Sequence, residues 1–133
     1  MKMNPVVHFE MPAKDKSRVK KFYESAFGWG MQQMGADMSE YLLATTTPTD
    51  PKTTRPTTPG AINGGFFGYK DDELNRAPHL VISVDDIDES IKAVKDAGGE
   101  VMGDKMDIPG IGKYVSFKDT EGNVVGILQP AQM

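Results

Sequence analysis

The sequence contains no cysteine among its 133 residues. A chain without cysteine has no disulfide, no thiolate nucleophile and no cysteine-based zinc or iron–sulfur site. We therefore expect a cytoplasmic protein, because the absence of cysteine is compatible with a reducing compartment although it does not require one.

Long apolar runs are also missing. No window approaches the ~18 consecutive apolar residues that a membrane-spanning helix needs. The first residues, Met1–Pro5, lack the long apolar run of a secretory signal. We expect no membrane association.

A clustered basic surface is the third feature that the sequence lacks. The formal net charge is -4, the pI is about 5.1 and the basic residues are scattered. Nucleic-acid binding normally requires Lys and Arg gathered on one face, so we expect no nucleic-acid partner. Hydrophobic residues make up 38% and charged residues 26%, which is typical of a single globular domain of this length.

The first half of the chain predicts a strand followed by a helix. Residues 6–9 predict a short strand that we expect Pro12 to end. Asp15 is a suitable helix N-cap, and Gly28 a suitable helix stop. Between them lies one apolar stripe at helical spacing, formed by Val19, Phe22, Tyr23, Ala26 and Phe27.

The rest of the first half predicts three further strands, over residues 29–34, 41–46 and 61–69. Residues 45–59 are rich in Thr and Pro. Proline cannot donate to a sheet ladder, so we expect an exposed, extended loop there, and a lid role for it stays open.

The second half repeats this order. Residues 79–84 predict a strand, and Asp86 with Glu89 forms a capping-box pattern at a helix start. Gly98 and Gly99 end that helix, and residues 100–106, 113–117 and 124–129 predict three strands.

The two halves coincide at an offset of 71 residues, which is the separation of His8 and His79. At this offset Asp86 falls on the Asp15 cap and Gly99 falls on Gly28. Any two strand–helix units of similar size look alike, and that explanation stays open. The repeated histidine favours a duplicated unit.

These segments resemble a known family. The motifs that carry the resemblance are His8–Asp15, Lys21–Glu24 and Phe27–Trp29, then His79–Asp86, and finally Asp119–Gln129. They are similar to the vicinal oxygen chelate superfamily of glyoxalases, bleomycin-resistance proteins and dioxygenases, nearest its lactoylglutathione lyase-related group. The resemblance implies an α+β fold of two tandem βαβββ modules, forming a curled eight-stranded mixed sheet around a cleft. Module one would cover about residues 1–70 and module two about residues 77–133 of a single domain.

The resemblance also implies a site. Metal-using relatives hold a divalent cation (Zn, Ni, Fe or Mn) with one His or Glu from each of four strands, and His8 and His79 match two of these positions. Gly126 stands where the closing strand of module two would supply Glu, and residues 61–67 contain no carboxylate. Two ligands are fewer than the roughly three that a catalytic cation takes from its protein. Either a divalent metal or no cofactor remains open.

Other side chains are candidates for the same cleft. Glu10 follows His8 by two residues and shares its strand face, so it is a weak candidate for a catalytic carboxylate, or an ordinary solvated residue. Phe67, Tyr114 and Gly126 are candidates for a substrate pocket. Further aromatic candidates are Trp29, Tyr41 and Phe66, and alternation places at least one of Phe66 and Phe67 in the core. We expect the glycines to leave volume free for a ligand.

Two functions stay open. The first is a lyase, isomerase or oxygenase that uses a divalent metal on a small molecule with adjacent oxygens. The alternative is a non-catalytic, metal-free protein that sequesters a small molecule, as drug-resistance relatives do. In both cases we expect a small-molecule ligand and a homodimer.

Overall fold

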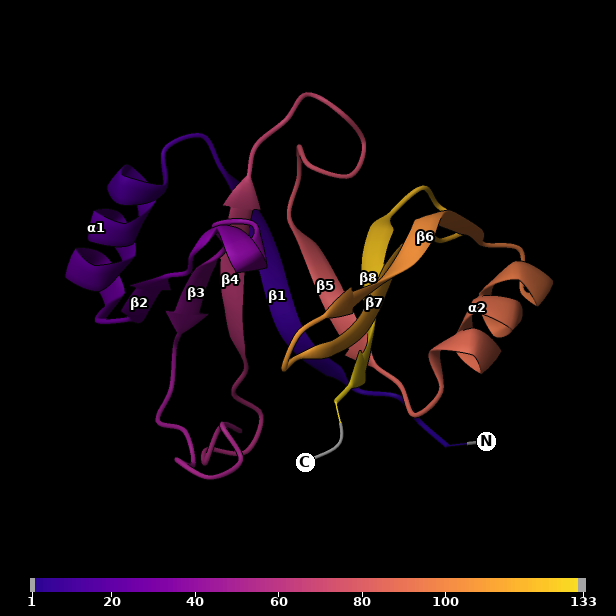
Figure 1. The fold of residues 1–133 in the computed structure, drawn as a ribbon, viewed down its shortest axis with the longest axis horizontal. Helices are drawn as coiled ribbons and strands as arrows, with labels where there is room; N and C mark the ends of the chain where they lie inside the picture. The colour runs from indigo at the N-terminus through magenta and orange to yellow at the C-terminus, as the bar shows by residue number, and fades with distance from the viewer. Residues whose placement is uncertain (1, 132–133) are drawn as a thin grey trace. The chain divides into compact units, whose positions relative to one another are not determined.

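The computed structural model describes residues 2–131, and in this range the chain forms eight strands and two α-helices (Figure 1). The elements follow in the order β1 Val6–Ala13, α1 Lys16–Phe27, β2 Gly30–Gln33, a short 3-10 helix η1 Ala36–Met38, β3 Leu42–Thr45, β4 Asn63–Gly68, β5 His79–Ser83, α2 Ile87–Asp96, β6 Glu100–Ile108, β7 Gly112–Lys118 and β8 Val124–Pro130.

The chain divides into two compact units, which we call module one and module two. Module one is His8–Pro78. Module two consists of His79 and the residues after it, together with Val7 and the residues before it. In module two, the amide of Ser83 donates to the carbonyl oxygen of Pro5 at 2.9 Å.

In module one the strands lie in the order β2-β3-β4-β1. β1 and β4 run parallel, whereas β3 pairs antiparallel with both β2 and β4. Module two has the corresponding order β6-β7-β8-β5, in which β5 and β8 run parallel and the other pairs are antiparallel. Parallel neighbours need a long crossover connection, and in each module the helix and two strands provide it.

Each module has a core between its helix and its sheet. The buried residues of module one are Ala13, Leu42, Ala44 and Phe66, with Val19 and Tyr23 of α1 packed against them. The buried residues of module two are Val84, Ile87, Val115 and Ile127, with Ile91 and Val94 of α2 packed against them. The face of each sheet that points away from its helix does not contribute to this core, so its side chains can form a binding site.

The structure confirms the expected fold class. Each module contains one strand, one helix and three strands, in the same order and with the same pairing. Asp15 and Asp86 both cap a helix, as the 71-residue offset predicts. The fold is α+β and glyoxalase-like.

The expected end of the first strand was wrong. Pro12 does not stop β1, which continues to Ala13 with Pro12 opposite Phe67. Proline has no backbone N–H to donate, so near the end of a strand it removes a single hydrogen bond between the strands. Pairing continues beyond it, because the amide of Tyr69 donates to the carbonyl oxygen of Ala13.

The apolar stripe predicted on α1 is only partly buried. Val19 and Tyr23 pack against the core, whereas Phe22 and Phe27 are 57% and 65% exposed. The two phenylalanine rings instead contact the ring of Tyr23 and each other.

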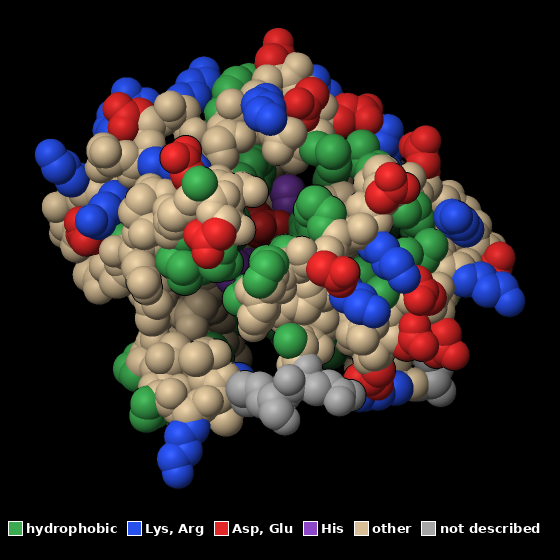
Figure 2. Space-filling view, in the orientation of Figure 1, with side chains coloured by type: hydrophobic (Ala, Val, Ile, Leu, Met, Phe, Trp, Pro, Cys, Tyr) green, Lys and Arg blue, Asp and Glu red, His purple; other side chains and the backbone are tan. Residues whose placement is uncertain are grey.

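The Thr/Pro segment forms no regular strand. Its one isolated bridge in the described range joins Thr49 and Pro56. Figure 2 shows basic and acidic side chains standing beside one another on the face in view. No helix within residues 2–131 is both long and apolar enough to cross a membrane.

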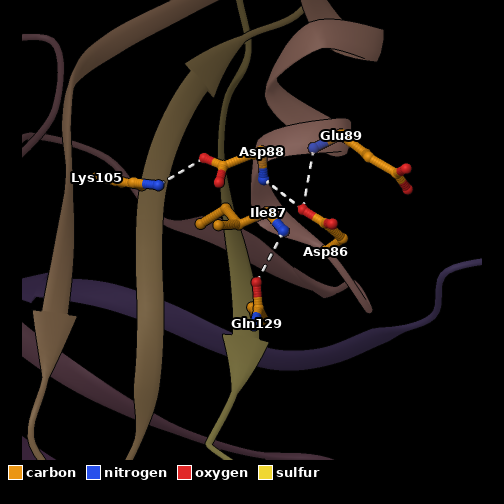
Figure 3. Close-up of polar contacts among 6 residues, drawn as sticks. All are labelled: Asp86, Ile87, Asp88, Glu89, Lys105 and Gln129. Atoms are coloured by element: carbon orange, nitrogen blue, oxygen red, sulfur yellow. Dashed lines mark hydrogen bonds and ion pairs between the residues drawn. The ribbon is translucent and has the colours of Figure 1, made fainter.

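The start of α2 shows why the sequence forms a helix there (Figure 3). The Asp86 carboxylate accepts hydrogen bonds from the amides of Asp88 and Glu89, at 3.0 and 3.2 Å. The side-chain oxygen of Gln129 accepts from the amide of Ile87 at 2.9 Å. Three of the four amides that a helix start leaves without partners are thus satisfied.

We predict that Asp86→Ala lowers the free energy of unfolding by about 1 kcal/mol, because two amides lose their acceptor. Urea denaturation followed by circular dichroism measures the change. Asp104→Ala is the matched control, because Asp104 is an exposed acidic residue outside the cap, and its effect should stay within about 0.5 kcal/mol. Equal effects of the two substitutions would contradict this role of Asp86.

Candidate functional site

Strand alternation separates the core of module one from its candidate site. Phe9 and Met11 of β1 pack on the core, so His8 and Glu10 point to the opposite face, which we call the site face. In the parallel pairing with β4, His8 lies opposite Asn63 and Glu10 lies opposite Gly65.

A tyrosine ring covers the glycine on this face. Gly65 is opposite Leu43 of β3, and Tyr41 precedes Leu43 by two residues, so Tyr41 is its diagonal neighbour. A Cβ added at Gly65 would overlap the ring of Tyr41. Only glycine at position 65 lets the ring lie this close to the strand.

The hydroxyl of Tyr41 joins the two polar residues of β1. It donates to Oε2 of Glu10 at 3.0 Å, and it lies 3.3 Å from Nε2 of His8. All three side chains are half-buried. We call this group the Glu10–Tyr41–His8 chain.

Module two repeats the same construction. Gly126 lies opposite Ser116 of β7, and Tyr114 precedes Ser116 by two residues. A Cβ at Gly126 would overlap the ring of Tyr114, whose hydroxyl lies 3.5 Å from Nε2 of His79.

The residue on the parallel strand opposite each glycine differs between the modules. The parallel partner of Gly126 is Val81, a residue that is only 2% exposed, whereas the partner of Gly65 is Glu10. A carboxylate therefore completes the chain in module one, and a valine takes its place in module two.

The expectation that the glycines leave volume free was wrong. At Gly65 and Gly126 the space beside the backbone is filled by Tyr41 and Tyr114. The sequence showed the glycines, but the ring above each one depends on a cross-strand register that the sequence does not display. The sequence predicted Tyr41 as an aromatic residue of the pocket, but it did not predict its hydrogen bonds to Glu10 and His8. A tyrosine two residues before the partner of each glycine is the signal that a known register would have provided.

The other predicted pocket residues divide between the two faces. Phe67 shares the site face with Gly65 by alternation, because Phe66 between them is 1% exposed and belongs to the core. Trp29 packs against the core of module one and stacks on Tyr23 with ring centroids 4.5 Å apart. The Trp29 ring therefore contributes to the packing of α1 on the core.

A family profile described as the glyoxalase/bleomycin resistance protein/dioxygenase superfamily matches residues 6–127. The chain belongs to this superfamily. It is 31% identical over 121 residues to a "Glyoxylase-like domain-containing protein" of Didymella fabae, covering 89% of this chain and 88% of that one.

A second relative is longer. The chain is 30% identical over 122 residues to "Putative glyoxylase CFP32" of Mycobacterium bovis, a match that covers 90% of this chain and 43% of the relative. The chain thus spans less than half the length of that relative.

Solved structures show the same fold. A methylmalonyl-CoA epimerase of Streptomyces coelicolor superposes with a TM-score of 0.69 at 13% identity, covering 98% of this chain and all of that one. A superfamily member from Vibrio splendidus superposes with a TM-score of 0.59 at 13% identity, covering 97% of this chain and all of that one. Identities this low establish the fold alone.

The superfamily often uses a divalent metal, and the residues of each module do not fit one. Nε2 of His8 and Nε2 of His79 each face a tyrosine hydroxyl, and a glycine takes the position of each expected carboxylate ligand. Within residues 2–131, no three His, Asp or Glu side chains gather into a group that could hold a metal ion.

Burial and charge act in opposite directions on His8. Desolvation lowers the pKa of its imidazole from the ordinary value of 6.5, and the neighbouring Glu10 carboxylate raises it; desolvation is the larger effect. His8 is therefore neutral near pH 7.

We predict that Gly65→Ala destabilises the protein by about 1–3 kcal/mol, because the added Cβ drives the Tyr41 ring out of place. In a Tyr41→Ala background the same substitution should cost far less, since the overlapping ring is gone. Chemical denaturation of the four proteins in this double-mutant cycle gives the coupling energy.

Gly68→Ala is the matched control on the same strand, because an added Cβ there has no heavy atom within 4 Å. It should be neutral or slightly stabilising. Equal costs of Gly65→Ala with and without Tyr41 would show that the ring does not occupy this space.

We predict that His8 titrates below pH 6.5, its ordinary value. The unfolded chain then binds this proton at a higher pH than the folded chain, so the free energy of unfolding should fall as the pH drops below 6.5. Proton NMR resolves the two histidines, and His79→Gln assigns them. A titration of His8 above 6.5, or an unchanged pH dependence of stability in His8→Gln, would contradict the effect of burial.

Proposed function

We propose that this superfamily member binds a small oxygen-bearing organic molecule without a metal, through the paired tyrosine and histidine side chains of its site faces. The observation that carries the proposal is the packing of Tyr41 on Gly65 and of Tyr114 on Gly126. In each module a neutral hydroxyl takes the place where the resemblance implies a charged ligand.

The chemistry of these groups supports an oxygen-bearing ligand. A phenol both donates and accepts hydrogen bonds, and a neutral imidazole does the same with its two nitrogens. Half-buried groups of this kind bind hydroxyl and carbonyl oxygens in partly apolar pockets. Among proteins of the same fold, a methylmalonyl-CoA epimerase has been solved in complex with 2-nitronate-propionyl-CoA, an oxygen-bearing coenzyme A ester.

A metal-dependent lyase close to the lactoylglutathione lyase-related group is the second candidate. His8 and His79 support it, because their side chains match family ligand positions. The hydrogen-bond geometry of both histidines favours the metal-free proposal instead. Assembly as a homodimer and a cytoplasmic location stay predictions that accompany either candidate.

The test combines metal analysis with binding. We predict that protein purified without chelator or histidine tag contains far less than one equivalent of Zn, Ni, Fe or Mn by plasma mass spectrometry. At least one of three probes should bind in calorimetry: bleomycin, the methylglyoxal–glutathione adduct or methylmalonyl-CoA. EDTA should leave its affinity unchanged, and Tyr41→Phe with Tyr114→Phe should weaken it.

The matched control for the metal analysis is the His8→Ala/His79→Ala double variant. Stoichiometric metal in the unmodified protein that this variant loses would overturn the metal-free proposal in favour of the lyase. Binding that EDTA abolishes would do the same. If none of the three probes bound, the small-molecule proposal itself would lose its support.

A further inference from the structure

The single proton of the Tyr41 hydroxyl fixes the direction of the Glu10–Tyr41–His8 chain. An ionised carboxylate only accepts hydrogen bonds, so Tyr41 gives its proton to Glu10. Contact between the Tyr41 oxygen and Nε2 of His8 then requires a proton on Nε2. A neutral imidazole carries one proton, so Nδ1 of His8 is left with a lone pair.

Module two lacks the residue that imposes this direction. Val81 stands where Glu10 stands in module one, and a valine accepts no proton from Tyr114. The tyrosine and histidine are the same in both modules, and Glu10 distinguishes module one from module two at this register position.

The lone pair on Nδ1 is available to a ligand. Within residues 2–131, the one hydrogen bond of the His8 side chain is that to Tyr41. The side chain is half-buried, so part of the ring meets solvent. Burial also keeps the ring neutral near pH 7, as an acceptor must be.

We propose that module one is an acid–base half-site in which Glu10, acting through Tyr41, holds His8 in its Nε2–H tautomer so that Nδ1 takes a proton from an acidic hydroxyl of the ligand. The proposal rests on the proposed function, since it names the ligand class of the same site. That class is an enol or a phenol whose electron-withdrawing substituents make its hydroxyl nearly as acidic as the imidazolium. Glu10 is a positioning residue, and His8 is the base.

The proton transfer balances within the described groups. The O–H bond of the ligand breaks, its proton forms a bond to Nδ1 and its electron pair stays on oxygen as an enolate or phenolate. The resulting imidazolium keeps Nε2–H on Tyr41, and the Glu10 carboxylate compensates its charge. A base with a lowered pKa takes protons readily only from donors of comparable acidity, which excludes ordinary alcohols.

The tautomer can be tested without any ligand. In protein labelled with ¹⁵N-histidine, long-range ¹H–¹⁵N correlation spectra above the His8 titration show which ring nitrogen carries the proton. We predict protonated Nε2 in the unmodified protein. Glu10→Val, which installs the residue of module two, should shift the population towards protonated Nδ1, because Tyr41 can then donate to Nε2.

Tyr41→Phe is the second variant, because it keeps the ring on Gly65 and removes only the hydroxyl. It should lower the population of protonated Nε2 towards the tautomer ratio of a free histidine. Glu24→Ala is the control, since it removes an exposed carboxylate of α1 in the same module, and it should leave the His8 spectrum unchanged. Protonated Nδ1 in the unmodified protein, or spectra of His8 that neither variant alters, would overturn the tautomer assignment.

The ligand class is tested with 4-nitrophenol, whose phenolate absorbs visible light. At a pH where the free probe is mostly neutral, binding should raise the phenolate signal. His8→Gln and Glu10→Val should weaken this binding by about tenfold, the effect of losing one charge-assisted hydrogen bond, while Glu24→Ala should not. Binding as neutral phenol, or no binding, would overturn the assigned ligand class.

These two experiments fail separately from the proposed function. Metal-free binding of a probe together with an unfixed tautomer would leave the proposed function in place and remove the acid–base half-site. Stoichiometric metal on His8 would remove both.

Discussion

In each module a tyrosine ring packs on a glycine of the neighbouring strand. The tyrosine lies two residues before the residue that pairs with this glycine, and the polar groups of the module depend on this contact. Gly65 and Gly126 have no side chain, so Tyr41 and Tyr114 can approach the strand closely enough for their hydroxyls to reach His8 and His79. Glycine weakens a strand, so its use in the middle of β4 and β8 requires a compensating contact. The ring provides that contact and brings a polar atom to the site face.

The sequence predicted most of the fold, because its signals are local. The sequence shows the helix caps Asp15 and Asp86, the helix stop Gly28 and the offset between His8 and His79. The structure confirms both caps, and Gly28 has a positive φ of 71°. The site was predictable only in part. Tyr41 and Gly65 are separated by the Thr/Pro segment, and a one-residue change of register would move the ring to the other face.

The difference between Glu10 and Val81 shows how two similar modules can diverge without a change of fold. Both residues occupy the same register position, opposite the glycine of the parallel partner strand. A buried valine extends the apolar surface of module two, whereas Glu10 places a charge beside a half-buried imidazole. One side chain differs at this position, whereas the pairing of the strands around it is the same in both modules.

In each module a glycine with a tyrosine ring packed on it stands where the family places a carboxylate. This replacement changes whether the site needs a counter-ion. Two carboxylates and two imidazoles concentrate negative charge, and a cation relieves that charge at the cost of its own hydration. A phenol has a pKa near 10 and is neutral at pH 7, so it needs no counter-ion and donates as well as accepts. In the Glu10–Tyr41–His8 chain the carboxylate is that of Glu10, and the hydroxyl of Tyr41 lies between it and the half-buried histidine.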